Sequence, residues 1–357
     1  MKMRVLYIGG FILPDKNAAA QRVVANAKAL RELDHTVYFL NTIHQKMKPQ
    51  WCDYFGFACY ECYRGNILKY LTSIKIIKNI IKNQKIDAVI AYNYPAIGLK
   101  KLSRYCRKHN IKIIADVTEW YVPQGNAVFR LIKNYDTNLR MKKLHVKMDG
   151  VIAISEDLYN YYKEKVFTVK IPPLVDVCDD KWNIKTEKNT EVLTLIYAGS
   201  PSAQKERLDL IIETVENLAG ELPVSLDGVG ISAEQYNRIY HKNFNGSHTK
   251  FWGRISNTET IALMKRADYS VVLRGNNKVV EAGFPTKVVE SITCGTPVIA
   301  NRFSNISDYL SEDNSILIED FDQLAVAIKK ALVERKTFDN TVFDYREYLS
   351  KFKMILF

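Results

Sequence analysis

The feature that most constrains the fold is a regular alternation of short apolar runs with amphipathic stretches. Apolar runs such as Val5–Ile8, Ala88–Tyr92 and Leu193–Tyr197 are separated by stretches with apolar residues at helical spacing, such as Ala18–Leu33. Strands that alternate with helices through short connections are typical of a parallel sheet covered by helices on both faces. The sequence therefore predicts an α/β chain with doubly wound, Rossmann-like parallel sheets. We expect strands at 5–8, 36–40, 88–92, 111–115, 151–154, 193–197, 223–226, 249–252, 269–273 and 297–299, and helices at 18–33, 68–81, 96–108, 207–218, 233–240, 258–265, 288–293, 322–334 and 343–357.

The alternation is interrupted once, near the middle of the chain. Pro172–Thr190 has two prolines, an acidic cluster and no sustained periodicity, which is typical of a linker. The chain of 357 residues also exceeds the size at which one core stops growing, roughly 250–300 residues. Two doubly wound halves joined by one linker predict a ligand cleft between them. We expect an N-terminal domain at 1–172, a linker at 173–190, a second domain at 191–340, and a C-terminal helix at 341–357 that packs back on the N-terminal domain.

The charge is unevenly distributed between the halves. The chain has 51 Lys and Arg against 39 Asp and Glu, a net charge of +12, of which residues 1–170 contribute +16 and residues 171–357 contribute −4. A basic half indicates an anionic partner. We expect an anionic membrane surface, the alternative being a solvated lysine-rich face. The basic residues lie on several separate helices without a recognised RNA or DNA module, so no nucleic-acid partner is expected.

The apolar runs, the N-terminal segment and the cysteines indicate the cellular compartment of the protein. No apolar run approaches the ~20 residues that span a bilayer. The first 14 residues imitate a short signal peptide, but Asp15 and Lys16 interrupt that pattern. Six cysteines in a chain of this length fit a reducing compartment. We expect a cytoplasmic protein, peripheral on the inner face of the cell membrane.

The segment Gly283–Ile299 carries the clearest chemical signal. A loop with Gly283 and Pro285 opens a helix there, so its first free backbone N–H groups could meet an anion such as a diphosphate. Glu290 falls within the first two turns, where its carboxylate could accept hydrogen bonds from the vicinal hydroxyls of a ribose. The alternative is a routine helix with a glycine stop and a surface glutamate.

The stretch PTKVVESITCGTPVIA, residues 285–300, resembles the donor-site motif of retaining GT-B glycosyltransferases of family 4. Ile196–Ser200 with Lys205 resembles the first strand and loop of the family's second domain, and Phe251–Ser256 resembles the stretch near the nucleotide base. Val151–Ser155 and Ile171–Asp176 resemble the end of the first domain and the hinge. The resemblance covers nearly the whole chain. It implies two Rossmann-like domains facing a cleft, a UDP- or GDP-linked sugar donor on the second domain, an acceptor hydroxyl on the first, and retention of configuration.

The resemblance also implies the donor-binding residues. Ser200 stands where the family usually has Arg, so Arg207 or Arg274 would have to supply the missing guanidinium. The position eight residues before Glu290 is Ala282, and Glu281 lies one residue early, so it reaches the sugar only if the loop shifts. The candidate donor-binding residues are Gly199, Ser200, Lys205, Arg254, Arg274, Phe284, Pro285, Thr286, Lys287 and Glu290.

The catalytic candidates are Asp116, Glu119, Lys205 and Glu281. Asp116 and Glu119 follow a strand of the first domain, near where the family often has a histidine beside the transferred sugar. A carboxylate there could act as general base on an acceptor hydroxyl, the alternative being a helix cap or a loop bond. By resemblance Lys205 holds the diphosphate. Lys287 adds positive charge near the phosphates or is an exposed helix lysine.

Two patterns in the sequence resemble metal sites but do not predict one. Cys59-x2-Cys62 with Cys52 lacks a fourth ligand at usual spacing, although His44 is near in sequence. Asp320-Phe321-Asp322 begins a helix, where Asp is a favoured cap. We expect no cofactor and no required metal.

The predicted function is transfer of a sugar from a nucleotide-sugar donor to an acceptor hydroxyl on a saccharide or lipid-linked saccharide, as in surface polysaccharide assembly. The alternatives are a sugar-nucleotide epimerase on the same fold and a catalytically silent sugar-nucleotide-binding protein.

Overall fold

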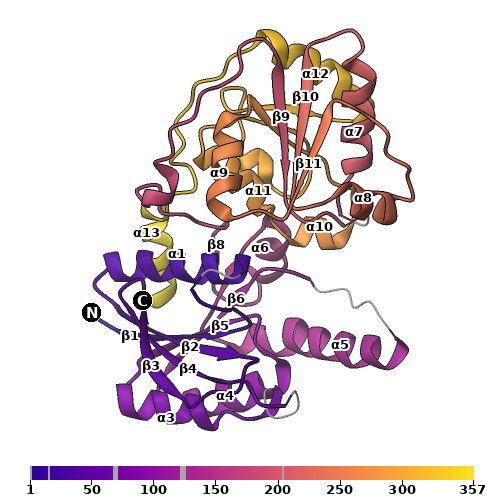
Figure 1. Ribbon diagram of the computed structural model, residues 1–357. Coiled ribbons are helices and arrows are strands. Elements are labelled where there is room, and N and C mark those ends of the chain that lie inside the picture. The colour runs from indigo at the N-terminus through magenta and orange to yellow at the C-terminus, as the bar shows by residue number, and fades with distance from the viewer. Residues whose placement is uncertain (1, 15–16, 67–70, 121–125, 203–204) are drawn as a thin grey trace. The chain divides into compact units, whose positions relative to one another are not determined.

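The chain forms two compact units (Figure 1). The computed structural model describes residues 2–14, 17–66, 71–120, 126–202 and 205–357. Unit 1 comprises Met1–Val175 and Asp344–Phe357, and unit 2 comprises Asp176–Phe343. The chain therefore passes between the units at Val175–Asp176 and again at Phe343–Asp344.

Unit 1 is built on an eight-stranded sheet in the order β3-β4-β2-β1-β5-β6-β7-β8. All neighbouring strands are parallel except β3 and β4, which form a hairpin. The inner strands are almost continuously buried because helices cover both faces, which explains their unbroken Val, Ile and Leu runs. The strands are β1 Arg4–Gly9, β2 Thr36–Ile43, β3 Gln50–Tyr54, β4 Phe57–Tyr63, β5 Ala88–Tyr92, β6 Lys112–Val117, β7 Gly150–Ala153 and β8 Thr168–Lys170, and the helices are α1 Ala18–Glu32, α3 Lys75–Gln84, α4 Ala96–Lys108, α5 Ala127–Leu139, α6 Glu156–Tyr162 and α13 Leu349–Leu356.

The C-terminal segment completes unit 1. Helix α13 packs against α1 and β8. The Nζ of Lys112 donates to the carbonyl oxygen of Leu356 at 2.7 Å, and that of Lys351 donates to the carbonyl oxygen of Lys170 at 2.9 Å. Gly150 allows this packing, because a Cβ there would overlap the Cδ1 of Ile355. Phe352, Ile355 and Leu356 of α13 thus belong to the core of the first unit.

Unit 2 has a fully parallel six-stranded sheet in the order β11-β10-β9-β12-β13-β14. Its core holds the apolar side chains of β9, β10 and β12 against helices α7 and α12. Two helices begin with reciprocal capping boxes, at Ser232 with Gln235 and at Ser256 with Glu259. The strands are β9 Leu193–Ala198, β10 Val224–Val229, β11 Thr249–Gly253, β12 Tyr269–Val272, β13 Val298–Asn301 and β14 Ser315–Ile318, and the helices are α7 Leu208–Leu218, α8 Ala233–Tyr240, α9 Asn257–Arg266, α10 Lys278–Ala282, α11 Thr286–Thr293 and α12 Leu324–Val333.

The predicted α/β class with two parallel-sheet, Rossmann-like domains is confirmed. Most differences are added elements, namely β3, β4, α5, α6, β8, α10 and β14. The helix expected at 68–81 begins in residues that lie outside the described ranges, and α3 starts at Lys75. The helix expected at 343–357 is a 3₁₀ turn, Tyr345–Tyr348, followed by α13.

The β3–β4 hairpin was missed for a definite reason. Its turn residues, Phe55 and Gly56, both have positive φ, +59° and +75°. Two consecutive positive φ values are the mark of a type I′ turn, which Asn-Gly or Asp-Gly usually forms. A Phe-Gly pair does not predict that turn from the sequence. The paired cysteines that suggested a metal site lie on this hairpin, with Cys59 and Cys62 buried on β4.

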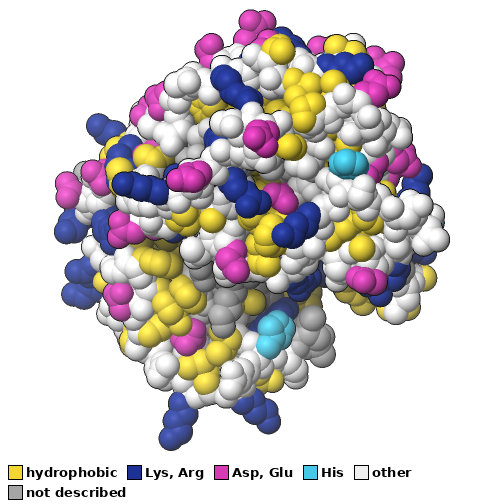
Figure 2. Space-filling view, turned by 45° about the horizontal axis from the view of Figure 1, so that its top comes forward, with side chains coloured by type: hydrophobic (Ala, Val, Ile, Leu, Met, Phe, Trp, Pro, Cys, Tyr) yellow, Lys and Arg dark blue, Asp and Glu magenta, His cyan; other side chains and the backbone are white. Residues whose placement is uncertain are grey.

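The space-filling view shows the surface chemistry of one face. In Figure 2, acidic and basic side chains are interspersed there, with scattered hydrophobic side chains between them. Within the described ranges, no helix is long and apolar enough to cross a membrane.

Candidate functional site

The topology of unit 2 places a candidate site at the ends of β9 and β12. After β9 the chain builds β10 and β11 on one side, and it then returns to build β12, β13 and β14 on the other. Ligands of doubly wound sheets bind at this switch point, beyond the carboxyl ends of the strands. Gly199 comes directly after β9, and Arg274 comes two residues after the end of β12. Both residues therefore lie at the carboxyl edge of the sheet.

Lys287, in the first turn of α11, reaches into this position. Its Nζ donates to the hydroxyl of Tyr197 at 2.6 Å and to Oε1 of Glu206 at 2.6 Å. Arg274 donates from Nη2 to the same Glu206 oxygen at 3.1 Å. Tyr197 donates its hydroxyl hydrogen to the other oxygen of Glu206. One buried carboxylate thus holds two cations, and we call Tyr197, Glu206, Arg274 and Lys287 the cationic cluster.

Burial and charge set the ionisation of the cationic cluster. Burial raises the pKa of Glu206, but attraction to Lys287 and Arg274 outweighs it and holds that pKa below its usual value. Burial lowers the pKa of Lys287 to about 8, with Glu206 opposing that shift. At neutral pH the cluster therefore carries two positive charges and one negative charge. Its net positive charge suits an anion.

Arg274 has donor capacity left over. Its Nε is buried and has no hydrogen-bond partner in the described part of the chain. Asn301 fixes its backbone, because Asn301 Oδ1 accepts from the Arg274 N–H at 2.8 Å and Asn301 Nδ2 donates to the Arg274 carbonyl at 2.9 Å. Arg207, the other candidate for the missing guanidinium, is instead paired with Asp209, at 2.9 Å from Nη2 to Oδ2. Of the two arginines, only Arg274 belongs to the cationic cluster.

Three further candidates of unit 2 lie at the surface. Ser200 and Lys205 are exposed, on the loop that follows β9, and Arg254 is exposed just after β11. Lys205 is tied to the switch point through its backbone, because its carbonyl oxygen accepts from the Gly275 N–H at 3.1 Å. Its side chain is therefore free of the core and close in sequence to Glu206.

The loop before α11 behaves as a support for the helix. Pro285 is the N-cap of α11 and gives no side-chain hydrogen bond, so Thr286 opens the helix with first-turn N–H groups that the helix itself cannot use. Phe284 is buried against Tyr309 and Phe343, with ring centroids 5.3 and 5.9 Å away. Its side chain therefore anchors the loop.

The two glutamates near α11 differ in setting. Glu290 is half-buried in the second turn, and burial raises its pKa, against the opposing effect of Lys181 and Lys287. Glu281 is half-buried at the end of α10. The hydroxyl of Ser304 donates to the carbonyl oxygens of Glu281 and Gly283 at 3.1 and 2.8 Å, which fixes the connection between α10 and α11.

Unit 1 has its own switch point, between β1 and β5. Gly9 ends β1 with φ +153°, and a Cβ there would overlap the carbonyl oxygen of Tyr92 at the end of β5. A pocket of about 160 Å³ opens beside it, at the carboxyl ends of β1, β2 and β4 and the start of α3. Its lining residues are Gly9, Leu40, Thr42, Cys62, Tyr63, Arg64, Ser73, Lys75, Ile76, Ile77 and Tyr94.

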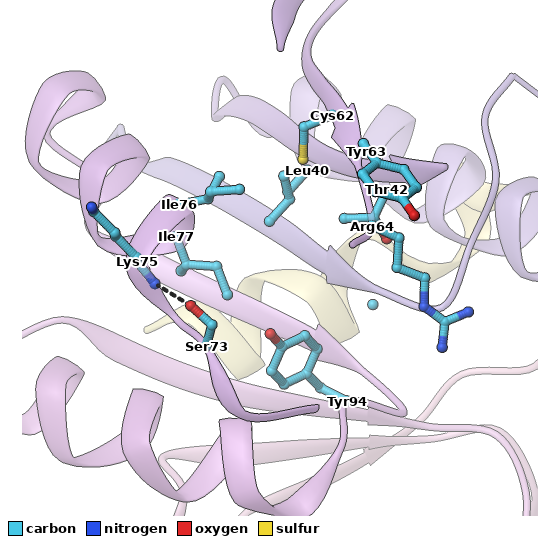
Figure 3. A pocket seen from close by; sticks show the side chains of 11 residues that line it. Leu40, Thr42, Cys62, Tyr63, Arg64, Ser73, Lys75, Ile76, Ile77 and Tyr94 are labelled. Atoms are coloured by element: carbon cyan, nitrogen blue, oxygen red, sulfur yellow. Dashed lines mark hydrogen bonds between the residues drawn. The ribbon is translucent and has the colours of Figure 1, made fainter. Parts of the chain in front are cut away.

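Figure 3 shows how this pocket is organised. Leu40, Ile76 and Ile77 form an apolar middle, and Arg64 and Lys75 stand at opposite ends. The Lys75 N–H lies 3.5 Å from the Ser73 hydroxyl oxygen, and Arg64 Nη1 lies 3.2 Å from His44 Nε2. Apolar walls with hydroxyl groups and the Arg64 guanidinium at the edge suit a polar ligand that also has apolar faces.

Asp116 is fully buried. Its Oδ1 accepts from Nη2 and Nε of Arg22 at 2.8 and 3.0 Å, and its Oδ2 accepts from the Tyr7 hydroxyl at 2.8 Å. Arg22 Nη1 in turn donates to the carbonyl oxygens of Ile171 and Pro172 at 3.1 and 3.0 Å. Both carboxylate oxygens of Asp116 are thus engaged in buried hydrogen bonds, whereas Glu119 is only half-buried.

Glu119 lies just after β6. It is half-buried, and it precedes Trp120, whose ring packs edge-on against Tyr161 at 5.0 Å. The neighbouring Thr118 hydroxyl donates to the Tyr92 hydroxyl at 3.2 Å. Glu119 therefore shares the carboxyl edge of the sheet with β5. Among the described residues, no three His, Cys, Asp or Glu side chains gather as a metal ion would require.

Comparisons with known proteins bear on what this fold does. Residues 179–348 match the family model described as "Glycosyl transferases group 1". None of the curated proteins matches the chain. The matched segment contains the whole cationic cluster and helix α11.

Solved structures share the fold over nearly the whole chain. Sucrose-phosphate synthase from Thermosynechococcus elongatus is 16% identical, with a TM-score of 0.73 over 99% of this chain and 98% of that one. Anabaena HepE, solved with UDP and glucose, is 14% identical, with a TM-score of 0.64 over 99% of both chains. The catalytic domain of starch synthase IV from Arabidopsis thaliana, bound to ADP and acarbose, is 10% identical, with a TM-score of 0.67 over 99% of both chains. The family match and the shared fold together support a GT-B glycosyltransferase.

Proposed function

We propose that the protein transfers a sugar from a nucleotide-sugar donor to an acceptor hydroxyl, with the donor bound on unit 2. The observation that carries this proposal is the cationic cluster, which stands behind Gly199 at the switch point, within the segment that matches the glycosyltransferase family. A diphosphate leaving group gains negative charge as its bond to the sugar breaks. Lys205, Lys287 and the N-terminus of α11 would stabilise that charge, as donors aimed at a developing anion do.

Arg274 takes the part of the missing guanidinium in this proposal. Its unpartnered Nε and its contact with Glu206 support that assignment over Arg207. The Glu290 carboxylate would accept hydrogen bonds from the ribose hydroxyls. Similar proteins solved with UDP and ADP support a nucleoside-diphosphate donor and leave the base open.

The acceptor would bind at the pocket beside Gly9, with Glu119 as general base. The apolar middle and polar ends of the pocket fit the alternating faces of a saccharide. The net charge of +16 over residues 1–170 supports an acceptor held at an anionic membrane, such as a lipid-linked saccharide of surface polysaccharide assembly. We also propose retention of configuration, as in family 4, no metal requirement, and a cytoplasmic protein peripheral to the membrane.

A thermal-shift panel of UDP-, GDP- and ADP-sugars tests donor binding. A ligand at about 100 times its Kd stabilises the folded state by about 2.7 kcal/mol, so one base should give a clear rise in Tm. Glu290→Ala and Lys205→Ala should abolish that rise, whereas Lys329→Ala, an exposed lysine of α12, should keep it. Unchanged shifts in both site variants would remove this donor site.

A product assay separates the alternative activities. Incubation of the stabilising donor alone should release little nucleotide if the protein is a transferase. A changed sugar nucleotide formed without an acceptor would identify an epimerase instead. Binding with no turnover in any acceptor extract would leave a silent sugar-nucleotide-binding protein.

A further inference from the structure

Helix α5 exposes an apolar stripe to solvent. Val128, Leu131, Ile132 and Tyr135 are 65%, 70%, 59% and 67% exposed. Their spacing of i, i+3, i+4 and i+7 places them on one face of the helix. Four large apolar side chains on one face are more than the scattered exposure that any surface has.

The C-terminal end of α5 fixes the helix to unit 1. Asp136 Oδ1 accepts from the Ala96 N–H at 2.8 Å, and Thr137 is buried. The helix continues into a π turn, Arg140–Leu144, where Arg140 Nη1 donates to the Asn93 carbonyl at 2.6 Å. The helix is therefore held at its C-terminal end, and the part that carries the apolar stripe projects from unit 1 into solvent (Figure 1).

The layer that carries the stripe is strongly basic. Helices α3 and α4 lie on one side of the sheet, with Lys78 of α3 over the Tyr105 ring of α4 at 4.9 Å, and α5 projects from the end of α4 (Figure 1). Their one acidic residue is Asp136, which is engaged with Ala96. The ten basic residues are Lys75, Lys78, Lys82, Lys100, Lys101, Arg104, Arg107, Lys108, Arg130 and Lys133.

We propose that α5 inserts its apolar stripe into the interfacial region of an anionic lipid bilayer, with the basic residues of α3 and α4 on the headgroups. An apolar face flanked by Lys and Arg is what an interfacial helix requires. A second copy of the chain fits worse, because it would bring two basic layers together. The inference rests on the proposed function for the lipid-linked nature of the acceptor, and it names the element that reaches the membrane.

Vesicle sedimentation tests the proposal on the full chain. Wild type should sediment with vesicles of phosphatidylglycerol and phosphatidylcholine in equal parts, and not with phosphatidylcholine alone. Leu131→Gln with Ile132→Gln should weaken that binding by about tenfold or more, because two side chains no longer enter the apolar layer. Val326→Gln with Val333→Gln, two exposed apolar residues of α12 in unit 2, is the matched control and should bind as wild type.

Two further measurements distinguish electrostatic attraction to the membrane from insertion of the apolar stripe. Lys82→Glu with Lys108→Glu should weaken binding to anionic vesicles and flatten its salt dependence. Ile132→Trp should show blue-shifted fluorescence with anionic vesicles if the stripe is inserted. Equal sedimentation of wild type and the Leu131/Ile132 variant, or a wild-type dimer that this variant converts to monomer, would overturn the proposal.

The donor thermal shift, measured on the same samples, separates this inference from the proposed function. Lost sedimentation with an intact shift in the Leu131/Ile132 variant supports both. Membrane binding with no shift from any sugar nucleotide would overturn the donor assignment and leave the membrane helix standing.

Discussion

The side chain of Lys287 crosses the Cα of Gly199. A Cβ at position 199 would overlap the Cε of Lys287 and lie 2.9 Å from its Nζ. Gly199 also has φ +145°, a backbone conformation that other residues rarely adopt. The glycine after β9 therefore does two things, since it turns the chain out of the sheet and leaves the passage through which Lys287 reaches Tyr197 and Glu206.

This relationship predicts the effect of Gly199→Ala. The substitution should destabilise unit 2 by about 1–3 kcal/mol from backbone strain and displace Lys287, so that UDP-sugar binding is lost. Urea unfolding measures the first effect and the donor thermal shift the second. Gly220→Ala is the control, because a Cβ there meets nothing within 4 Å. Equal stability of the two variants would show that Lys287 does not occupy this passage.

The buried ion pair predicts the effect of Lys287→Met. The variant keeps most of the side-chain volume but leaves Glu206 with Arg274 as its remaining cation, and removal of one buried partner costs about 3–5 kcal/mol. Adding Glu206→Gln to Lys287→Met should recover part of that loss, since the unpaired carboxylate is gone. Denaturant midpoints of the two single variants and the double variant give the coupling between the residues. If the effects of the two single substitutions simply add in the double variant, Lys287 and Glu206 do not form a stabilising ion pair.

The pKa of Lys287 predicts a pH dependence. Burial lowers this pKa from 10.5 to about 8, so the unfolded chain binds more protons than the folded chain between about pH 8 and 10.5. The contribution of Lys287 to stability therefore rises with pH in that window, whereas affinity for an anionic donor falls as the ammonium loses its proton. Affinity for UDP should drop about tenfold on passing from pH 7 to 9, as expected for the loss of one charge-assisted hydrogen bond.

Titration calorimetry with UDP at each pH measures this drop. Lys287→Met should bind weakly at pH 7 and show no step near pH 8. A wild-type profile that stays level across the window would mean that Lys287 remains protonated or that its charge does not reach the diphosphate.

The sequence was informative about unit 2 because its signals are local. The apolar runs at β9 and β12, the proline before α11 and the glycines beside them are short patterns that periodicity and turn chemistry can read. What it could not show was the partner of Lys287. Glu206 stands next to the exposed Lys205, and nothing in that neighbourhood distinguishes a buried glutamate from a surface one. The cationic cluster joins residues from three separate segments, and only the fold brings them together.

The sequence was less informative about unit 1, because a sequence pattern does not show which way a side chain points or what it contacts. Helix α5 was not predicted, although Val128, Leu131 and Ile132 have helical spacing. That spacing would predict a face buried in the core, whereas the structure exposes it. Asp116 was noticed for its position at a strand end, which is where a catalytic carboxylate would stand. A pattern in one strand cannot reveal that Arg22, ninety-four residues away, occupies that carboxylate.

The pairing of Arg22 with Asp116 predicts that Asp116→Asn acts on stability first. Both groups are buried. Arg22 also donates hydrogen bonds to the carbonyl oxygens of Ile171 and Pro172, close to the point where the chain leaves unit 1. The variant leaves the guanidinium without its carboxylate, at a cost of about 3–5 kcal/mol. Urea unfolding should show this loss, and Asp157→Asn, an exposed carboxylate of α6, should change stability by a few tenths of that amount at most.

The same variant distinguishes a positioning residue from a general base. If Asp116 only positions Arg22, the folded fraction of Asp116→Asn should keep the wild-type pH profile of kcat/KM for sugar transfer, because the ionising group that activates the acceptor is still present. Glu119→Gln should remove the fall of kcat/KM at acidic pH, where protonation inactivates a general base, while leaving the unfolding midpoint close to wild type. Loss of the pH dependence in Asp116→Asn, with Glu119→Gln fully active, would return the catalytic role to Asp116.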